Sequence, residues 1–165
     1  MHLARETGKH IIFNPAPAQL LPDFVYQDID TLVMNESELK LLLGHQTDQQ
    51  HDDASLAELI RKFLRLGVKE AVVLTLGSRG LMFATASGKA GMLPARKVHV
   101  VDTTAAGDTF VGAYAVQRAK QPDGGFDIEK ALDFATLAAS KTVERKGAMA
   151  AIPYMTEIAA ETEQQ

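Results

Sequence analysis

The chain has 165 residues, 46% of them hydrophobic and 23% charged, which is sufficient for one folded domain with its own core. A formal net charge of −4, without a cluster of lysine and arginine, argues against nucleic acid as a partner. The lack of cysteine excludes disulfides and thiol catalysis, and no apolar run approaches the roughly 18 residues of a membrane helix. No signal-peptide pattern is present either, so we expect a cytoplasmic protein without a membrane partner.

The first part of the chain alternates short apolar runs with runs of helical spacing. Apolar runs bounded by turn residues predict buried strands, whereas apolar residues every three or four positions predict helices that pack on a core. Ser55 and Glu58 have the spacing of a capping box and predict a helix start at Ser55. In chain order, the predicted elements are a helix tail over 1–5, strands over 10–14 and 31–35, a helix over 36–43, a polar loop over 47–53, a helix over 55–66 and a strand over 71–77.

The second part of the chain continues this alternation. The turn residues Ser87 and Gly88 divide two apolar runs and predict a hairpin. The predicted elements are this hairpin over 81–95, a strand over 97–102, a helix that begins near 106, a glycine-rich loop over 122–125, a helix over 128–142 and a last helix opened by Pro153. Strands that alternate with helices form βαβ units, so the sequence predicts one α/β domain with a mostly parallel sheet.

Polar or small residues follow every predicted strand. They are Asn14, Asn35, Gly77 and the stretch Asp102–Asp108, although Asn14 next to Pro15 alone indicates no more than a stiff exit from its strand. The carboxyl ends of parallel strands share one edge of a sheet, and ligands of α/β proteins bind at that edge. We therefore expect these residues to gather at one site. Neither a GxxxxGK[ST] nor a GxGxxG pattern is present, which disfavours a nicotinamide-dependent enzyme.

The stretch Ala105-Ala106-Gly107-Asp108 allows two interpretations. Small residues permit a tight turn, and the unpaired amides at a helix start attract an anion such as a phosphoryl group. Asp108 beside such a group could accept a proton from a hydroxyl that attacks it. A carboxylate in the first turn of a helix is also favoured as a cap, without any chemistry. These residues alone do not decide between catalysis and capping.

Two other stretches carry similar alternatives. In "TLGSRG", which begins at Thr75, the glycines let backbone approach a ligand and Ser78 and Arg79 could reach phosphate or ribose. An ordinary turn with a solvated arginine is the simpler explanation of this stretch. In "NESE", Asn35 could lie near phosphate and Glu38 near a metal-bound water. A helix cap followed by glutamates is again the simpler explanation.

Together and in this order, these stretches resemble the ribokinase-like carbohydrate kinases of the phosphofructokinase-B type. "DTTAAGDTF", from Asp102 to Phe110, resembles the family's C-terminal signature D-T-x-x-A/G-G-D-x-F. "NPAPA", "NESE" and "TLGSRG" are similar to family motifs in the same order, and "RKGAMAAIP", from Arg145 to Pro153, resembles the stretch that closes a monovalent-cation site. The resemblance begins near Asn14 and covers nearly all of the chain, so capping alone is set aside as the explanation of the signature.

The resemblance implies a ribokinase-like three-layer α/β sandwich and a kinase that transfers the γ-phosphate of ATP to a primary hydroxyl of a sugar, with D-ribose favoured. It implies that Asp108 is the general base and that Ala105, Ala106, Gly107 and Asp108 form the anion hole. It also implies that Thr136 faces the adenine, at a position where many relatives have Asn or His. The other implied residues are Asn35, Thr75, Leu76, Gly77, Ser78, Arg79, Gly80 and Gly107 for ATP, Glu38 for Mg²⁺ through water, and Asp102, Thr104, Thr142, Arg145, Gly147 and Ala151 for K⁺.

The chain departs from the family in one respect. Nothing in it matches the N-terminal half of these kinases, which carries a Gly-Gly sugar-binding motif and a β-sheet lid. We therefore expect residues 1–165 to be the nucleotide-binding, C-terminal part of a sugar kinase, weakly active or inactive alone. Its first strand would leave an open sheet edge at which copies of the chain associate. The alternative function is a nucleotide-binding or interaction module that has kept the anion hole and lost catalysis.

Overall fold

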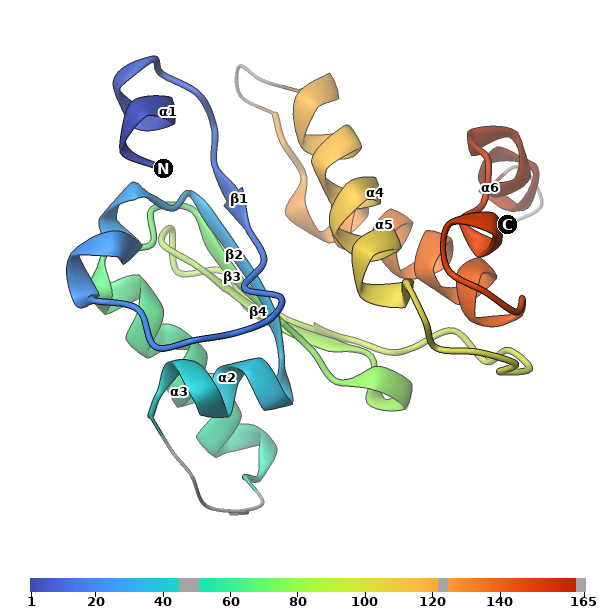
Figure 1. Ribbon diagram of the computed structural model, residues 1–165, viewed down its shortest axis with the longest axis horizontal. Coiled ribbons are helices and arrows are strands. Elements are labelled where there is room, and N and C mark those ends of the chain that lie inside the picture. Colours follow the sequence, from blue (N-terminus) through green and yellow to red (C-terminus); the bar gives the residue numbers. More distant parts are fainter. Residues whose placement is uncertain (45–50, 122–124, 163–165) are drawn as a thin grey trace. The chain divides into compact units, whose positions relative to one another are not determined.

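The structure is a computed structural model that describes residues 1–44, 51–121 and 125–162 (Figure 1). It has an α/β fold, as predicted, and it divides into two compact units, Met1–Pro94 and Ala95–Gln165. The first unit holds the β-sheet, and the second consists of helices and connecting segments. Of the predicted loops, residues 47–50 and 122–124 lie outside the described residues.

The sheet of the first unit has five strands in the order β1-β2-β3-β4-β5. Strands β1 (Ile12–Phe13), β2 (Thr31–Asn35) and β3 (Ala71–Thr75) are parallel, whereas β4 (Leu81–Thr85) and β5 (Ala90–Leu93) form an antiparallel hairpin beside β3. The first four residues of both β2 and β3 are buried, which is typical of apolar strands inside a sheet. These strands and the hairpin confirm the sequence predictions, although β1 is shorter than its apolar run.

Helices cover one face of this sheet. Figure 1 shows α2 (Glu36–Leu42) and α3 (Asp53–Leu66) on the same side of the strands, and their apolar residues form the core with the sheet. The shorter helices of the unit are α1 (His2–Glu6), η1 (Asp23–Asp28) and η2 (Gly77–Arg79). The core comprises Tyr26, Ile29, Leu32, Met34, Leu39, Leu42, Leu56, Ile60, Phe63, Val68, Val72, Leu74, Leu76, Met82 and Ala84.

The second unit is built on two long helices, α4 (Ala106–Lys120) and α5 (Ile128–Val143), which pack side by side (Figure 1). Buried hydroxyls join them, because Thr142 Oγ1 donates a hydrogen bond to Thr109 Oγ1 at 2.9 Å. The remaining helices are η3 (Met149–Ala151) and α6 (Met155–Thr162), and the buried residues shared by α5 and α6 are Leu137, Ala138 and Ile158.

The strand predicted over 97–102 does not form, although all of these residues are described. The Val101 and Asp102 amides instead donate to the Val143 carbonyl at the end of α5, at 2.7 and 3.2 Å. β-Branched residues favour a strand only where a neighbouring strand can pair with them. The prediction failed because the local pattern does not reveal that these amides bond to a helix end.

The start of α3 also differs from the prediction. The helix begins at Asp53 with Asp52 as its N-cap, and the Asp52 carboxylate accepts a hydrogen bond from the Ser55 amide at 2.8 Å. Glu58 pairs instead with Arg65, one of whose nitrogens lies 2.7 Å from Glu58 Oε1. The capping box predicted at Ser55 and Glu58 is therefore wrong, because Asp52 caps the same helix three residues earlier.

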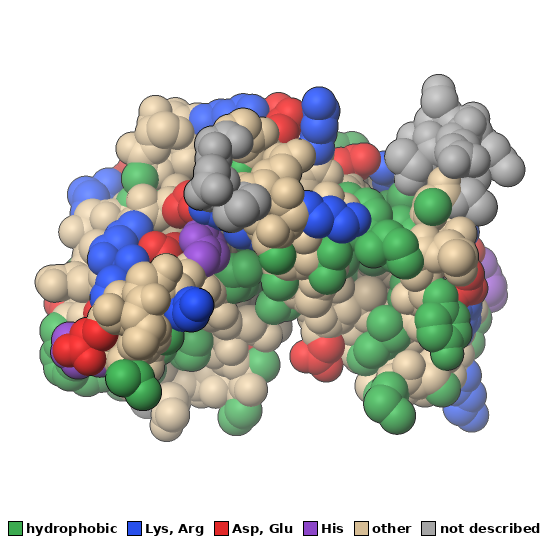
Figure 2. Space-filling view, turned by 90° about the horizontal axis from the view of Figure 1, so that it is seen from above, with side chains coloured by type: hydrophobic (Ala, Val, Ile, Leu, Met, Phe, Trp, Pro, Cys, Tyr) green, Lys and Arg blue, Asp and Glu red, His purple; other side chains and the backbone are tan. Residues whose placement is uncertain are grey.

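The surface carries mixed charges. On the face shown in Figure 2, lysine and arginine side chains are interspersed with aspartate and glutamate. Large exposed apolar side chains include Leu3, Phe24, Met149 and Tyr154. Within the described part of the chain, no helix has both the length and the apolar character that crossing a membrane requires.

Candidate functional site

The carboxyl ends of the parallel strands gather predicted site residues in the first unit. Asn14 follows β1, and its side-chain amide donates to the Val33 carbonyl of β2 at 3.0 Å. Asn35, at the end of β2, is the register partner of Thr75 at the end of β3. Asn14, Asn35 and Thr75 therefore lie along one edge of the sheet, as the strand pattern predicts.

Asn35 and Glu38 build the start of α2. Asn35 Oδ1 accepts a hydrogen bond from the Glu38 amide at 2.9 Å, and Glu38 Oε2 accepts one from the Asn35 amide at 2.8 Å. This reciprocal capping box confirms that the "NESE" stretch caps a helix. Asn14 Nδ2 lies 3.5 Å from the same Glu38 oxygen, so Asn14 is more than the exit of a strand. The cap does not use the Asn35 side-chain nitrogen or Glu38 Oε1.

The loop from Thr75 to Gly80 is held at its backbone and at its arginine. The Leu76 amide donates to the Gly80 carbonyl at 2.8 Å, which closes the loop around η2. Arg79 Nη2 lies 2.8 Å from Glu36 Oε1, and Arg79 Nη1 lies 3.0 Å from Asp53 Oδ1. The arginine is therefore anchored to α2 and α3, in contrast to the solvated side chain that the turn pattern allows.

In the second unit, α4 begins directly after a residue in the left-handed conformation. Ala105 is the N-cap, with φ of 62° and ψ of 5°, and it makes no side-chain capping bond. Asp108 lies in the first turn of α4 and is exposed. No other described residue forms a hydrogen bond or ion pair with its carboxylate. The Asp108 side chain thus does not cap the helix, and it is open to a ligand.

The amides at the start of α4 are only partly used within the protein. The Ala106 amide donates to the Thr103 carbonyl at 3.3 Å, and the Thr109 amide donates to the Ala105 carbonyl at 2.9 Å. The amides of Gly107 and Asp108 belong to the first helical turn, where the helix itself offers no acceptor. Together with the positive end of the helix dipole, these two amides can bind an anion.

Asp102 connects the turn before α4 with the segment after α5. Its Oδ1 accepts hydrogen bonds from the Thr104 hydroxyl at 2.6 Å and the Thr104 amide at 2.9 Å, and its Oδ2 accepts one from the Gly147 amide at 3.0 Å. These bonds, that of the Thr104 hydroxyl first, lower the pKa of Asp102 from 3.8 to about 2. The carboxylate is therefore ionised at neutral pH.

The other predicted cation-site residues lie in the segment after α5. The Arg145 amide donates to the Thr142 carbonyl at 3.1 Å, and Ala151 is buried in η3. The Arg145 guanidinium pairs with Glu157 of α6, and this hydrogen-bonded pair raises the pKa of Arg145 and lowers that of Glu157. Thr136, predicted to face adenine, lies on α5 and donates its hydroxyl to a carbonyl of its own helix at 2.8 Å.

The predicted residues thus fall into two groups. The first unit holds those predicted for nucleotide and Mg²⁺: Asn35, Glu38 and the loop Thr75–Gly80. The second unit holds those predicted for proton transfer, the anion, adenine and K⁺: Asp102, Thr104, Ala105, Ala106, Gly107, Asp108, Thr136, Thr142, Arg145, Gly147 and Ala151. Direct hydrogen bonds join Asp102, Thr104 and Gly147 in the second group.

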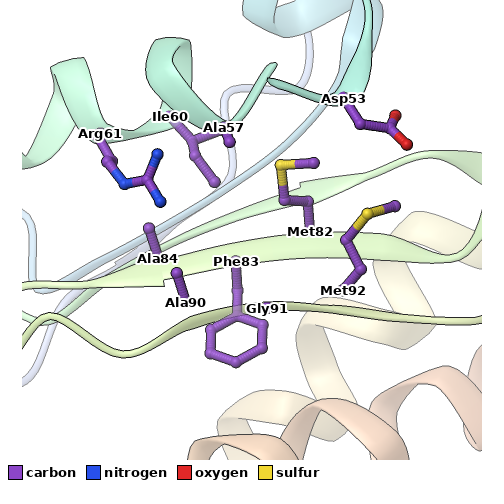
Figure 3. A pocket seen from close by; sticks show the side chains of 10 residues that line it. All are labelled: Asp53, Ala57, Ile60, Arg61, Met82, Phe83, Ala84, Ala90, Gly91 and Met92. Atoms are coloured by element: carbon purple, nitrogen blue, oxygen red, sulfur yellow. The ribbon is translucent and has the colours of Figure 1, made fainter. Parts of the chain in front are cut away.

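A hollow of about 290 Å³ lies between α3 and the β4–β5 hairpin (Figure 3). Ile60 of α3 and Met82 of β4 point into it, whereas the Phe83 ring points away from α3. Asp53 lies at one end of the lining, so it borders both this hollow and the Arg79 ion pair. No residue predicted for the functional site lines the hollow.

Comparison with known protein families decides the family. The sequence profile described as "pfkB family carbohydrate kinase" matches residues 1–155. The chain belongs to the pfkB family. The match includes both groups of site residues up to Ala151, and it confirms the resemblance that "DTTAAGDTF" and the other motifs indicate.

Among relatives, this pfkB-family chain is 38% identical over 156 residues to the ribokinase of Staphylococcus aureus, covering 94% of the chain and 49% of that enzyme. Its fold is similar to that of Thermotoga maritima ribokinase, with a TM-score of 0.82 and 35% identity, over 98% of this chain and 52% of the other. The fold is also similar to that of Arabidopsis thaliana ribokinase complexed with ribose and ATP, with a TM-score of 0.83 and 31% identity. The match covers 96% of this chain and 49% of the other. The chain spans about half the length of these relatives.

The oxygen-rich donor sets in this pfkB-family chain fit hard cations. Asp102 is an ionised carboxylate that accepts hydrogen bonds from Thr104 and Gly147, and carboxylate oxygens are among the ligands that hard cations prefer. Glu38 offers one carboxylate, and Mg²⁺ bound with nucleotides commonly takes one or two together with water and phosphate. No cluster of three or more His, Asp or Glu side chains suited to a metal occurs among residues 1–44, 51–121 and 125–162.

The sequence pattern does not indicate that Glu36, Asp53 and Glu157 pair with the predicted site arginines. Each is an acidic residue in the first turn of a helix, where the dipole already explains it. Their arginine partners are 43, 26 and 12 positions away in the sequence. No local pattern in the sequence indicates these pairs, because they form only when distant elements pack.

Proposed function

We propose that this chain is the nucleotide-binding part of an ATP-dependent sugar kinase, with D-ribose as the favoured sugar. Its relatives named ribokinase support the reaction class, and the Arabidopsis relative is complexed with ribose and ATP. The observation in this chain that carries the proposal is Asp108. Its exposed carboxylate has no partner among the described residues and lies in the first turn of α4, beside amides that lack an acceptor in the helix.

In the proposed reaction, Asp108 accepts the proton of the sugar's primary hydroxyl while that oxygen attacks the γ-phosphorus. A bond forms between the sugar oxygen and the γ-phosphorus, and the bond to the β,γ-bridging oxygen breaks with its electron pair leaving on ADP. The Gly107 and Asp108 amides stabilise the negative charge on the transferred group. Ala105 and Ala106 form the turn that exposes these amides, since the Ala106 amide itself donates to Thr103.

Other residues hold the nucleotide in this proposal. Asn35 and the loop Thr75–Gly80 bind ATP, and Thr136 faces its adenine. Thr75 and Asn35 are register partners, so the sheet itself fixes the spacing of these two contacts. A ligand held by neighbouring strand ends loses little freedom between binding and reaction, which is how positioning contributes to phosphoryl transfer.

Two cations complete the proposal. Glu38 would hold Mg²⁺ through water, and a bound Mg²⁺ neutralises charge on the phosphates. Oxygens of Asp102, Thr104, Thr142, Arg145, Gly147 and Ala151 would hold K⁺, mainly backbone carbonyls, and a bound K⁺ offsets negative charge near the start of α4. Asp102 joins the two segments of this proposed site, since it accepts hydrogen bonds from both Thr104 and Gly147.

We expect the chain by itself to transfer phosphate weakly or not at all. It spans about half the length of the relatives that it matches, and none of its motifs resembles the family's sugar-binding motif or lid. Loss of sugar positioning and of water exclusion lowers the rate of transfer, while nucleotide binding depends on residues that are present.

The test is ADP release by the chain with Mg²⁺-ATP, K⁺ and ribose, beside the Asp108→Asn and Glu129→Gln variants. Glu129 is also a first-turn acid, in α5, and serves as the matched control. The kinase is supported if sugar-dependent ADP release falls about 100-fold or more in Asp108→Asn and is retained in Glu129→Gln. Release that Asp108→Asn leaves unchanged contradicts the assigned base.

The alternative is a nucleotide-binding or interaction module without catalysis. It predicts that ATP raises the melting temperature of the chain but that no sugar stimulates ADP release, so only a measurable sugar-dependent release decides in favour of the kinase. The open carboxylate of Asp108 does not distinguish the alternatives, because a module could retain it. If ATP leaves the melting temperature unchanged at millimolar concentration, the nucleotide assignment itself is wrong.

A further inference from the structure

We propose that Arg79 is a positioning residue for the nucleotide, which acts through Glu36 and Asp53 and does not bind phosphate itself. The inference rests on the proposed function, because it concerns the same loop at the end of β3. It changes the role that the "TLGSRG" motif alone indicates for the arginine, from a phosphate contact to an anchor of the loop.

The first argument is the geometry of the guanidinium. Nη2 lies 2.8 Å from Glu36 Oε1 and Nη1 lies 3.0 Å from Asp53 Oδ1, so the two terminal nitrogens face two different carboxylates. Both distances are those of charge-assisted hydrogen bonds. An arginine that binds phosphate uses this same pair of nitrogens as a fork. In this structure the fork is already occupied by protein.

The second argument is charge. Two carboxylates surround one guanidinium, so the cluster carries a formal charge of about −1. Such a cluster does not attract an anionic phosphate, whereas an unpaired arginine does. The three side chains are 45%, 44% and 56% exposed, and for pairs so exposed each interaction is weak. The cluster therefore orients a loop more than it stabilises the fold.

The third argument is what the arginine connects. Arg79 is the last residue of η2, which begins at Gly77 and is followed by Gly80, and these two glycines have positive φ values of 57° and 92°. Backbone hydrogen bonds close this loop on itself, but among the described residues none of them joins it to α2 or α3. Glu36 follows Asn35 directly in α2, so the Arg79–Glu36 pair joins the loop to the helix start that carries the other proposed ATP contact.

A preformed loop binds its ligand without a further cost of ordering. We therefore expect Arg79→Gln and Glu36→Gln each to weaken nucleotide binding by about three- to fivefold, the range for exposed ion pairs. Because the effect acts through the loop and not through phosphate, the factor should be the same for ATP, ADP and adenosine. Asp53→Asn should weaken binding in the same direction.

The experiment is titration calorimetry of the chain with Mg²⁺-ATP, ADP and adenosine. The variants are Arg79→Gln, Glu36→Gln and Asp53→Asn, which each remove one member of the cluster. Arg65→Gln is the control, since it breaks an exposed ion pair with Glu58 on α3 outside the cluster. We expect this control to keep the parental dissociation constants.

The outcomes separate a positioning residue from a phosphate ligand. If Arg79 bound phosphate, Glu36→Gln would leave ATP binding unchanged or tighten it, because a competing carboxylate is removed. Arg79→Gln would then weaken ATP more than adenosine. Either result overturns the inference and leaves the proposed function standing. A parental chain that binds none of the three ligands overturns the proposed function and this inference with it.

Discussion

The backbone of Ala105 has φ of 62°, in the left-handed region, where a residue with a Cβ is strained by roughly 1–2 kcal/mol. The other described residues with positive φ are glycines. Ala105 lies immediately before the first turn of α4, where the proposed base and anion hole are found. Strain of this kind persists only where the surrounding structure holds the turn, and it clusters at functional sites.

This strain predicts the effect of glycine at the same position. Ala105→Gly should raise the free energy of unfolding by roughly 0.5 kcal/mol, because relief of the strain exceeds the added entropy of the unfolded chain. Ala115→Gly, inside α4, should instead lower it by about 1 kcal/mol. Urea denaturation of both variants measures the contrast. Equal destabilisation by the two changes would contradict the left-handed conformation of Ala105.

Asp102 predicts a dependence of stability on pH. Its pKa is about 2 in the folded chain, against 3.8 for the ordinary side chain. The folded state therefore binds fewer protons than the unfolded chain in this interval, so the carboxylate contributes stability above pH 3.8 and loses that contribution as the pH falls towards about 2.

Asp102→Asn should accordingly flatten the fall in stability within that interval and lower the stability at neutral pH. Denaturant unfolding at several pH values measures the slope, and Asp23→Asn, at an exposed carboxylate of η1, is the control for the loss of one acidic group. If stability falls with pH as steeply in Asp102→Asn as in the parent, Asp102 does not hold Thr104 and Gly147 in solution.

At the scale of elements, α3 shows how a helix start is chosen among several candidates. Asp52, Ser55 and Glu58 all occur near its beginning, and Asp52 is the residue whose side chain accepts from a helical amide. Capping depends on an extended backbone at the cap, which Asp52 has, with φ of −73° and ψ of 168°. Ser55 already lies within the helix and cannot serve in the same way.

The Asp52 cap predicts a different effect of mutation from that of a capping box at Ser55 and Glu58. Asp52→Ala should lower the melting temperature by a few degrees, because an amide at the start of α3 loses its acceptor. Glu58→Gln should change it little, since Glu58 forms an exposed ion pair and no cap. Differential scanning calorimetry compares the two. A larger effect of Glu58→Gln would favour the capping box at Ser55.

At the scale of the whole molecule, the chain matches the pfkB family over residues 1–155 and spans about half the length of its ribokinase relatives. In the sheet of the first unit, β1 is an edge strand that pairs only with β2 among the described residues. An edge strand presents unpaired backbone groups along its outer side. This is the edge at which the sequence predicts association of copies.

We expect the chain to self-associate as its concentration rises. The Ile12→Lys variant should have a smaller weight-average mass than the parent, because a charge on an edge strand disfavours pairing with a second copy. Leu3→Lys changes an apolar residue of α1 that is 74% exposed, and it is the control for added charge. Sedimentation velocity over a range of concentrations measures the mass. A chain that stays monomeric at all concentrations, or an equal effect of both variants, would contradict association through β1.

Much of the fold could be predicted because its signals are local. The apolar runs of β2 and β3, the capping pattern of Asn35 with Glu38, and the hairpin turn at Ser87 and Gly88 each depend on residues within a few positions of one another. The order of the motifs also indicated the pfkB family before any fold was known. Asp108 was identified in the same way, from the small residues that precede it.

The tertiary structure decided what depends on distant partners. The valines of 97–102 form no strand, since the amides of Val101 and Asp102 bond to the end of α5. Asp102 bonds to Gly147 across 45 positions, and Arg79 reaches Glu36 across 43. Local sequence determined which segments become helices and strands, because backbone preferences act over a few residues. Only packing decided which carboxylates form ion pairs or hydrogen bonds and which, like that of Asp108, have no partner among the described residues. An ion pair requires two groups that the sequence places far apart.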